Sequence, residues 1–223
     1  MLRGSGETIE GPRPSDWFDV FVDDRGDLVA LLMDVRSSAE STDDFLATSL
    51  RDTRTALRRC DALHTVVGEL EMQLATHPGV EAGLIILRLS QRDARVEILN
   101  AGMPAIANAR PGGRLDLYPA LSGPIGRRVG EVHPYELVPL VWGGTWLAVS
   151  DGMMNGSLDT ENVAALCAKL DLAGQGLALA SASSDELYDA FQRLLSAARF
   201  LRDDASGVVI AADSSARFQS GIM

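Results

Sequence analysis

Hydrophobic and polar positions near the start of the chain follow a pattern typical of β-strands. Residues 17–22 and 28–35 are two runs rich in β-branched, aromatic and aliphatic side chains. The five residues between them, 23–27, are aspartates, an arginine and a glycine, which favour a turn. The pattern therefore predicts a β-hairpin.

The next stretch, residues 42–76, has the periodicity of a helix. Apolar side chains, with one threonine among them, recur there at three- and four-residue steps, at Leu46, Leu50, Thr53, Leu57, Cys60, Leu63, Val67, Leu70 and Leu74. Because the stretch is longer than most helices of globular proteins, we expect a break near Asp61. The Asp61 side chain is a suitable N-cap for a second helix.

The middle of the chain returns to short apolar runs. The β candidates are 83–89, 95–100, 105–109, 114–118, 132–138 and 145–150. Pro111, Gly112 and Gly113 form a tight connection between two of them. Most of these connections are short, so neighbouring strands are expected to pair antiparallel.

The last part of the chain predicts helices and then one strand. Two apolar stripes at helical spacing run through residues 163–170 and 187–198, and Ser183 and Glu186 have the spacing of a capping box. The final strand is expected at 207–212. This order predicts a single α+β domain over residues 1–223, with two mainly antiparallel sheets flanked by helices and loose ends at about 1–13 and 214–223.

Composition narrows the class of protein. The formal net charge of −11 disfavours a nucleic-acid partner. No apolar run is long enough to span a membrane and no signal peptide is apparent, which favours a cytoplasmic protein. Cys60 and Cys167 lie on apolar helical stripes and are expected to be buried free thiols. The three histidines, at 64, 77 and 133, share no ligand spacing, so surface or capping roles are expected for them.

Four aspartates stand at the ends of predicted strands: Asp16, Asp34, Asp151 and Asp203. If they converged, each pair of charges at 4 Å would repel by about 4 kcal/mol at an effective dielectric constant of 20. Convergence would therefore require protonation or cations, and Mg²⁺ or Mn²⁺ suit carboxylate and water oxygens. The alternative is that these residues are ordinary turn and capping residues.

Five segments carry a resemblance to a known family. They are Ser15-Asp16-Trp17-Phe18-Asp19-Val20-Phe21, Leu32-Met33-Asp34-Val35, Ala101-Gly102-Met103-Pro104 with Ser122-Gly123-Pro124-Ile125-Gly126, Val149-Ser150-Asp151-Gly152-Met153, and Asp203-Asp204-Ala205-Ser206. In this order, over about residues 8–212, the chain resembles the PP2C-like phosphatases of the bacterial SpoIIE/RsbU/RsbX group. The resemblance implies an αββα sandwich and a serine/threonine protein phosphatase.

The resemblance also implies a site with two divalent cations, Mn²⁺ or Mg²⁺. Asp34 would bridge both ions, with Asp16 and the backbone carbonyl of Val35 on one and Asp151 and Asp203 on the other. Asp34 and Asp151 would act catalytically through a metal-bound water. The implied partner is a phosphorylated STAS-domain protein or anti-sigma factor antagonist.

The chain departs from the family pattern beside Asp34. Arg36-Ser37-Ser38-Ala39 stands where the family has Ser-Gly-His-Gly, and Met103 stands where it has histidine. Two further hypotheses therefore stay open: a pseudophosphatase that binds phosphoproteins without turnover, and a hydrolase of small phosphoesters. Arg36 is a candidate contact for the substrate phosphate, because a guanidinium group suits phosphate oxygens. The alternative for Arg36 is a solvated loop arginine.

Overall fold

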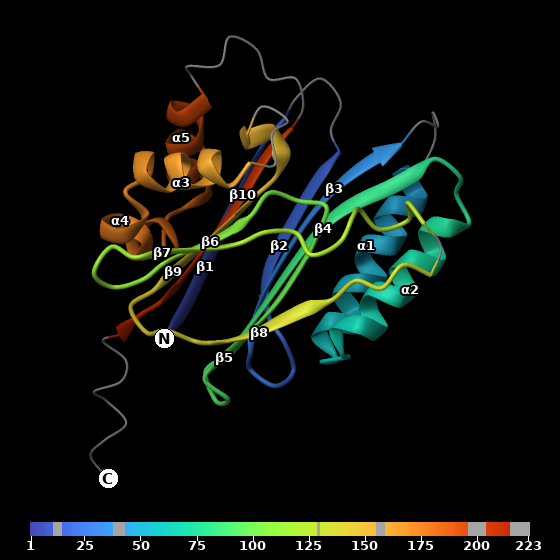
Figure 1. The fold of residues 1–223 in the computed structure, drawn as a ribbon, viewed down its shortest axis with the longest axis horizontal. Helices are drawn as coiled ribbons and strands as arrows, with labels where there is room; N and C mark the ends of the chain where they lie inside the picture. Colours follow the sequence, from blue (N-terminus) through green and yellow to red (C-terminus); the bar gives the residue numbers. More distant parts are fainter. Residues whose placement is uncertain (11–14, 38–42, 129, 155–158, 196–203, 215–223) are drawn as a thin grey trace.

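Two five-stranded antiparallel sheets lie face to face between two groups of helices (Figure 1). This computed structural model describes residues 1–10, 15–37, 43–128, 130–154, 159–195 and 204–214. The arrangement confirms the α+β class and the αββα sandwich expected from the sequence. None of the helices in these ranges is long and apolar enough to cross a membrane.

Each sheet is covered on its outer face by helices. The first sheet has the strand order β1 (Leu2–Ile9), β10 (Ala205–Ala212), β9 (Thr145–Val149), β6 (Ile106–Ala109) and β7 (Leu115–Tyr118). Packed against it are α3 (Thr160–Lys169), α4 (Leu172–Leu179) and α5 (Ser184–Leu195). The second sheet has the order β2 (Asp16–Val22), β3 (Leu28–Ser37), β4 (Val80–Ser90), β5 (Arg95–Ala101) and β8 (Tyr135–Pro139), and is covered by α1 (Asp43–Arg58) and α2 (Leu63–Ala75).

Strand β3 shows how the strands build the core. Its odd-numbered residues from Val29 to Val35 pack against α1 and α2. Its even-numbered residues Leu28, Ala30 and Leu32 face the other sheet. Even-numbered residues of β2, β9 and β10 enter the same inter-sheet layer, namely Phe18, Val20, Trp146, Ala148, Val208 and Ile210. One parity of β2, β3, β9 and β10 therefore points into the space between the sheets.

The predicted hairpin is confirmed by β2 and β3, which pair along their whole shared length. The predicted helix break is also confirmed, because α1 ends at Arg58 and α2 begins at Leu63. The predicted cap is wrong: Ala62 is the N-cap of α2, and no side chain caps the helix there. The Asp61 carboxylate instead accepts a hydrogen bond from Arg59, 3.1 Å away.

The expectation of a loose start is wrong for the first residues of the chain. Leu2–Ile9 forms the edge strand β1, paired residue by residue with β10. Its glycines allow the two sheets to approach: a Cβ atom at Gly6 would lie 2.5 Å from Phe18 Cδ2. The sequence pattern hid this strand because glycines and polar residues replace the usual apolar alternation. Residues 11–13 and 215–223 lie outside the described residues.

Smaller predictions have mixed outcomes. The capping box is confirmed, since Ser183 N donates to Glu186 Oε2 at 2.9 Å and Glu186 N donates to Ser183 Oγ at 3.4 Å. Cys60 and Cys167 are buried free thiols, as expected. The surface or capping role is wrong for His133, which is buried with its Nδ1 2.8 Å from Ser122 Oγ.

Candidate metal centre

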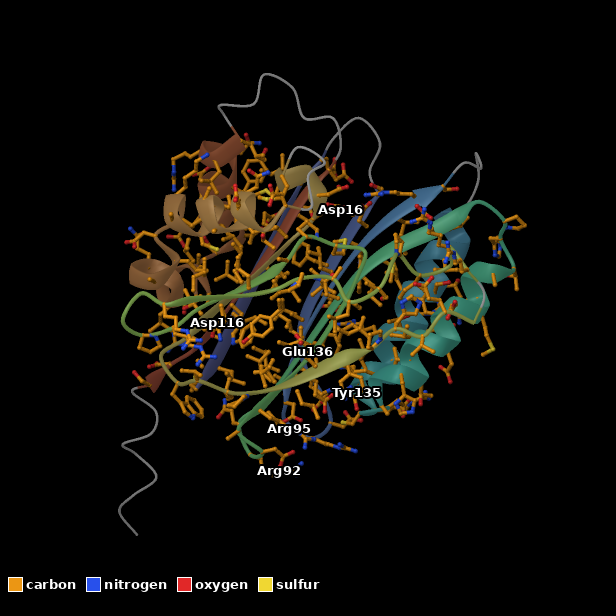
Figure 2. All side chains as sticks on the ribbon, viewed as in Figure 1. Asp16, Arg92, Arg95, Asp116, Tyr135 and Glu136 are labelled. Carbon is orange, nitrogen blue, oxygen red and sulfur yellow. The ribbon has the colours of Figure 1, made fainter. Side chains whose placement is uncertain are left out.

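The candidate site lies where the inter-sheet layer changes from apolar to polar. Asp16 opens β2 and Asp34 lies directly opposite it in β3, so the two residues are cross-strand partners. Both continue the parity of Phe18 and Leu32, whose side chains point between the sheets. Figure 2 shows Asp16 at one end of the sheets and Arg92 at the other.

The first sheet contributes the opposite wall of the site. Ser206 N donates to Ser150 Oγ and Ser150 N donates to Ser206 O, both at 2.9 Å, where β9 and β10 meet. Asp151 follows Ser150 and opens a short 3₁₀ helix, η1 (Asp151–Met154). A Cβ atom at Gly152 would overlap the carbonyl oxygen of Asp204, so glycine permits this close crossing. These contacts hold Asp151 near the second sheet.

Asp204 fixes the segment that carries Asp16. Its buried carboxylate Oδ2 accepts hydrogen bonds from Ser15 N at 2.5 Å and from Asp16 N at 3.1 Å. Ser15 O accepts a hydrogen bond from Val35 N at 3.1 Å, which ties the Asp16 segment to the backbone of β3. Sequence reasoning did not assign a role to Asp204. The sequence did contain a signal for it. Asp204 lies two residues before Ser206 and four before Val208, and residues at this spacing along a strand share a face, here the one between the sheets.

Burial and neighbouring carboxylates govern the charge of Asp16. Burial raises the pKa of Asp16 to about 7, the Ser150 and Ser206 hydroxyls act against this, and the Asp34 and Asp204 charges add to it. The site is therefore a set of acidic groups held together in a partly dehydrated place. Such a set is stabilised by an added cation.

Arg36 contributes a positive charge from within the chain. Its Nη2 atom lies 3.3 Å from Asp34 Oδ2 and also donates to Asp151 Oδ2. Burial lowers the pKa of Arg36, but the Asp34 and Asp151 carboxylates outweigh this and raise it overall, so the guanidinium stays charged. The Arg36 side chain is 46% exposed, against 2% for Asp34 and 12% for Asp151. Arg36 thus links the two sheets at the rim of the site.

The structure brings three of the four predicted aspartates into one place. Asp16 faces Asp34 across the hairpin, and Arg36 joins Asp34 to Asp151. The backbone of Val35 lies between Asp34 and Arg36 in the same strand. Asp203, the fourth predicted ligand, lies outside the described residues.

The donor set at Asp16 and Asp34 fits a divalent cation. Asp16 Oδ2 is buried and has no hydrogen-bond partner among the described residues, although burial of such an atom is unfavourable without one. Carboxylate and carbonyl oxygens are the donors that Mg²⁺ and Mn²⁺ prefer. Within the described ranges, no three histidine, cysteine, aspartate or glutamate side chains are grouped closely enough to hold a metal by themselves. A complete coordination shell would therefore need the Val35 carbonyl, waters or residues outside those ranges.

The two-sheet sandwich is the fold of the PP2C-like phosphatases. The family model for Stage II sporulation protein E (SpoIIE) matches residues 41–213, and the chain belongs to the SpoIIE family. No curated protein sequence matches the chain.

Solved structures agree with the family. The RsbU and RsbW domains of a Mycobacterium tuberculosis protein match with a TM-score of 0.70 and 17% identity, over 96% of this chain and 60% of that one. The PP2C phosphatase domain and regulatory fragment of SpoIIE from Bacillus subtilis match with a TM-score of 0.70 and 15% identity, over 95% and 64%. RsbX in complex with magnesium matches with a TM-score of 0.64 and 12% identity, over 94% of both chains. The chain therefore spans less than two thirds of the first two structures, and at these identities the likeness shows the shared fold.

Proposed function

We propose that the protein is a metal-dependent phosphatase that hydrolyses phosphoserine or phosphothreonine on a partner protein. The observation that carries this proposal is the pair Asp16 and Asp34, which face each other with a buried Asp16 oxygen that has no hydrogen-bond partner among the described residues. Membership of the SpoIIE family supports it.

The proposed ligands follow from the positions of the acidic residues. Asp16, Asp34 and the Val35 carbonyl would hold one divalent cation, Mn²⁺ or Mg²⁺, and Asp34, Asp151 and Asp203 form the second ligand set. A bound cation supplies an activated water and neutralises charge on the phosphoryl group. Asp34 and Asp151 are the proposed catalytic carboxylates and would act through that water. Arg36, whose side chain is 46% exposed, is the proposed contact for the substrate phosphate at the rim.

The proposed substrate is a phosphorylated STAS-domain protein or anti-sigma factor antagonist of a partner-switching pathway. Support comes from the structural neighbours, which include RsbU and RsbW domains, RsbX and a structure described with the bacterial stressosome. The net charge of −11 fits poorly with a free acidic ligand but is compatible with a folded partner protein.

Phosphate release from a phosphorylated STAS protein tests the function directly. Release should require Mn²⁺ and stop when EDTA is added. Asp34→Ala should abolish it, whereas Asp93→Ala should not, because Asp93 lies in the turn between β4 and β5, next to Arg92, which Figure 2 shows at the far end of the sheets. Release that persists in EDTA or in Asp34→Ala would contradict the proposed site. Turnover of p-nitrophenyl phosphate alone would indicate a small-phosphoester hydrolase instead.

A phosphoprotein-binding role without turnover is the second candidate. It is favoured by the contact of Arg36 with both Asp34 and Asp151, two of the residues proposed to act in catalysis. This candidate predicts that the phosphorylated partner binds more tightly than the unphosphorylated one and that no phosphate is released with Mn²⁺ present. Measuring binding and phosphate release on the same sample separates the two functions.

A further inference from the structure

The position of Arg36 Nη2 affects which metal ions the site can bind. This single nitrogen atom contacts Asp34 Oδ2 at 3.3 Å and also donates to Asp151 Oδ2. A metal ion shared by the same two oxygens would have to stand between them, where the nitrogen now stands. The guanidinium and such an ion therefore exclude each other.

The backbone keeps Arg36 at this point. Arg36 is two residues beyond Asp34 in β3, so both side chains leave the strand on the inter-sheet side. Its cross-strand partner in β4 is Glu81, which adds a further negative charge beside the guanidinium. Asp151 reaches Arg36 from the other sheet, at the start of η1. The arginine is thus held by charges on three sides.

The contacts of Arg36 also favour a single added ion. The guanidinium already supplies a positive charge to Asp34 and Asp151, the two carboxylates that a second ion would have to share. The carboxylate oxygen that could bind an added ion is Asp16 Oδ2, which is buried without a hydrogen-bond partner in the described part of the chain. On the Asp151 side, the described oxygen already accepts from Arg36.

We infer that Arg36 is a built-in cation that replaces the second metal ion, so that the protein binds one divalent cation at Asp16, Asp34 and Val35. This inference rests on the proposed function for the existence of the first ion. It departs from the two-ion site that the family resemblance implies, because the second ligand set proposed above would hold no ion while Arg36 is present. Arg36 is then a determinant of metal stoichiometry.

Counting bound Mn²⁺ tests the inference without measuring activity. Equilibrium dialysis with elemental analysis should find one Mn²⁺ per wild-type chain and two per Arg36→Ser chain. Arg36→Lys should keep one, because an ammonium group can occupy the same point between the carboxylates. Arg92→Ser is the matched control, since Arg92 is 67% exposed, pairs with Asp93 and lies at the opposite end of the sheets, and it should also keep one. Arg36→Gln, which retains much of the side-chain stem, provides a second neutral variant if Arg36→Ser does not fold.

The possible counts separate failure of this inference from failure of the proposed function. Two Mn²⁺ ions in the wild type, or no additional ion in folded Arg36→Ser and Arg36→Gln, would overturn the inference and leave a metal-dependent phosphatase in place. No ion in the wild type but one in Arg36→Ser would show that Arg36 excludes the only ion, which would contradict both the single-ion site inferred here and the proposed function. No ion in either protein would overturn both.

Discussion

The carboxylate of Asp204 accepts a hydrogen bond from the backbone N–H of Asp16, a residue 188 positions earlier in the chain. A second bond, from Ser15 N, reaches the same oxygen. Asp204 therefore acts as a positioning residue. It joins the segment before β10 to the start of β2 and so fixes the position of the backbone that carries the Asp16 side chain. The contact depends on an accepting oxygen rather than on a metal ion.

Replacing Asp204 should separate its positioning role from its charge. Asp204→Ala removes the acceptor of two partly buried N–H groups, and we expect a loss of about 2–4 kcal/mol in the free energy of unfolding. Asp204→Asn keeps an accepting oxygen and should lose about half of that or less. Urea unfolding of both variants without added metal measures the difference. Equal stability of Asp204→Ala and the wild type would contradict the positioning role.

Mn²⁺ should stabilise the protein through Asp16. A ligand that binds only the folded state at one hundred times its dissociation constant adds about 2.7 kcal/mol to the free energy of unfolding. We expect this increment in the wild type and its removal by EDTA. Asp16→Asn should lose it because the amide is a weaker metal ligand than the carboxylate.

Asp116→Asn is the control for the Mn²⁺ measurement. Asp116 lies in β7, away from the site, and pairs with Arg110 and Arg114. Its replacement can change the basal stability but should leave the Mn²⁺ increment unchanged. Loss of the increment in Asp116→Asn, or its retention in Asp16→Asn, would show that the stabilising ion binds elsewhere.

Much of the fold was predictable because local signals agreed with the tertiary structure. The β2–β3 hairpin joins two strongly β-prone runs through a short turn, and the Ser183–Glu186 capping box is a contact between near neighbours. Strand β1 could not be recognised locally, because its order comes from pairing with β10 near the other end of the chain. Helix α4 was also missed: it contains Gly174 and Gly176, and tertiary packing overrides their poor helix propensity.

The candidate site also has a part that the sequence predicted and a part that it did not. Asp16, Asp34 and Asp151 were identified from short motifs, and the structure places them together. The contact of Arg36 with Asp151 could not be read from the sequence, because it joins two sheets and residues 115 positions apart. The role of Asp204 was hidden for the same reason.

Gly152 should be intolerant of substitution. An added Cβ atom would overlap the carbonyl oxygen of Asp204, and a backbone atom in this position cannot move aside as a flexible side chain can. We expect Gly152→Ala to lose about 3 kcal/mol or more of unfolding free energy and to displace Asp151. Gly68→Ala in α2 is the control, because nothing lies within 4 Å of its added Cβ. It should stabilise the protein by about 0.5–1 kcal/mol. Chemical unfolding that gives equal stabilities for the two variants would contradict the crowding at Gly152.

Cys167 should make the stability of the protein fall at alkaline pH. Burial raises the pKa of Cys167 to about 12 in the folded protein, whereas an unfolded thiol has a pKa of about 8.5. The folded state therefore holds its thiol proton more tightly, and the resulting stability is present below about pH 8.5 and lost as the pH rises toward 12. Over this window the free energy of unfolding should fall by about 1.4 kcal/mol per pH unit from this group. Cys167→Ala should have lower stability at pH 7, because a buried side chain is shortened, but a shallower slope between pH 9 and 10.5. Urea unfolding at several pH values measures both slopes in proteins that share every other titrating group. Parallel slopes would show that the Cys167 thiol ionises as easily in the folded chain as in the unfolded one.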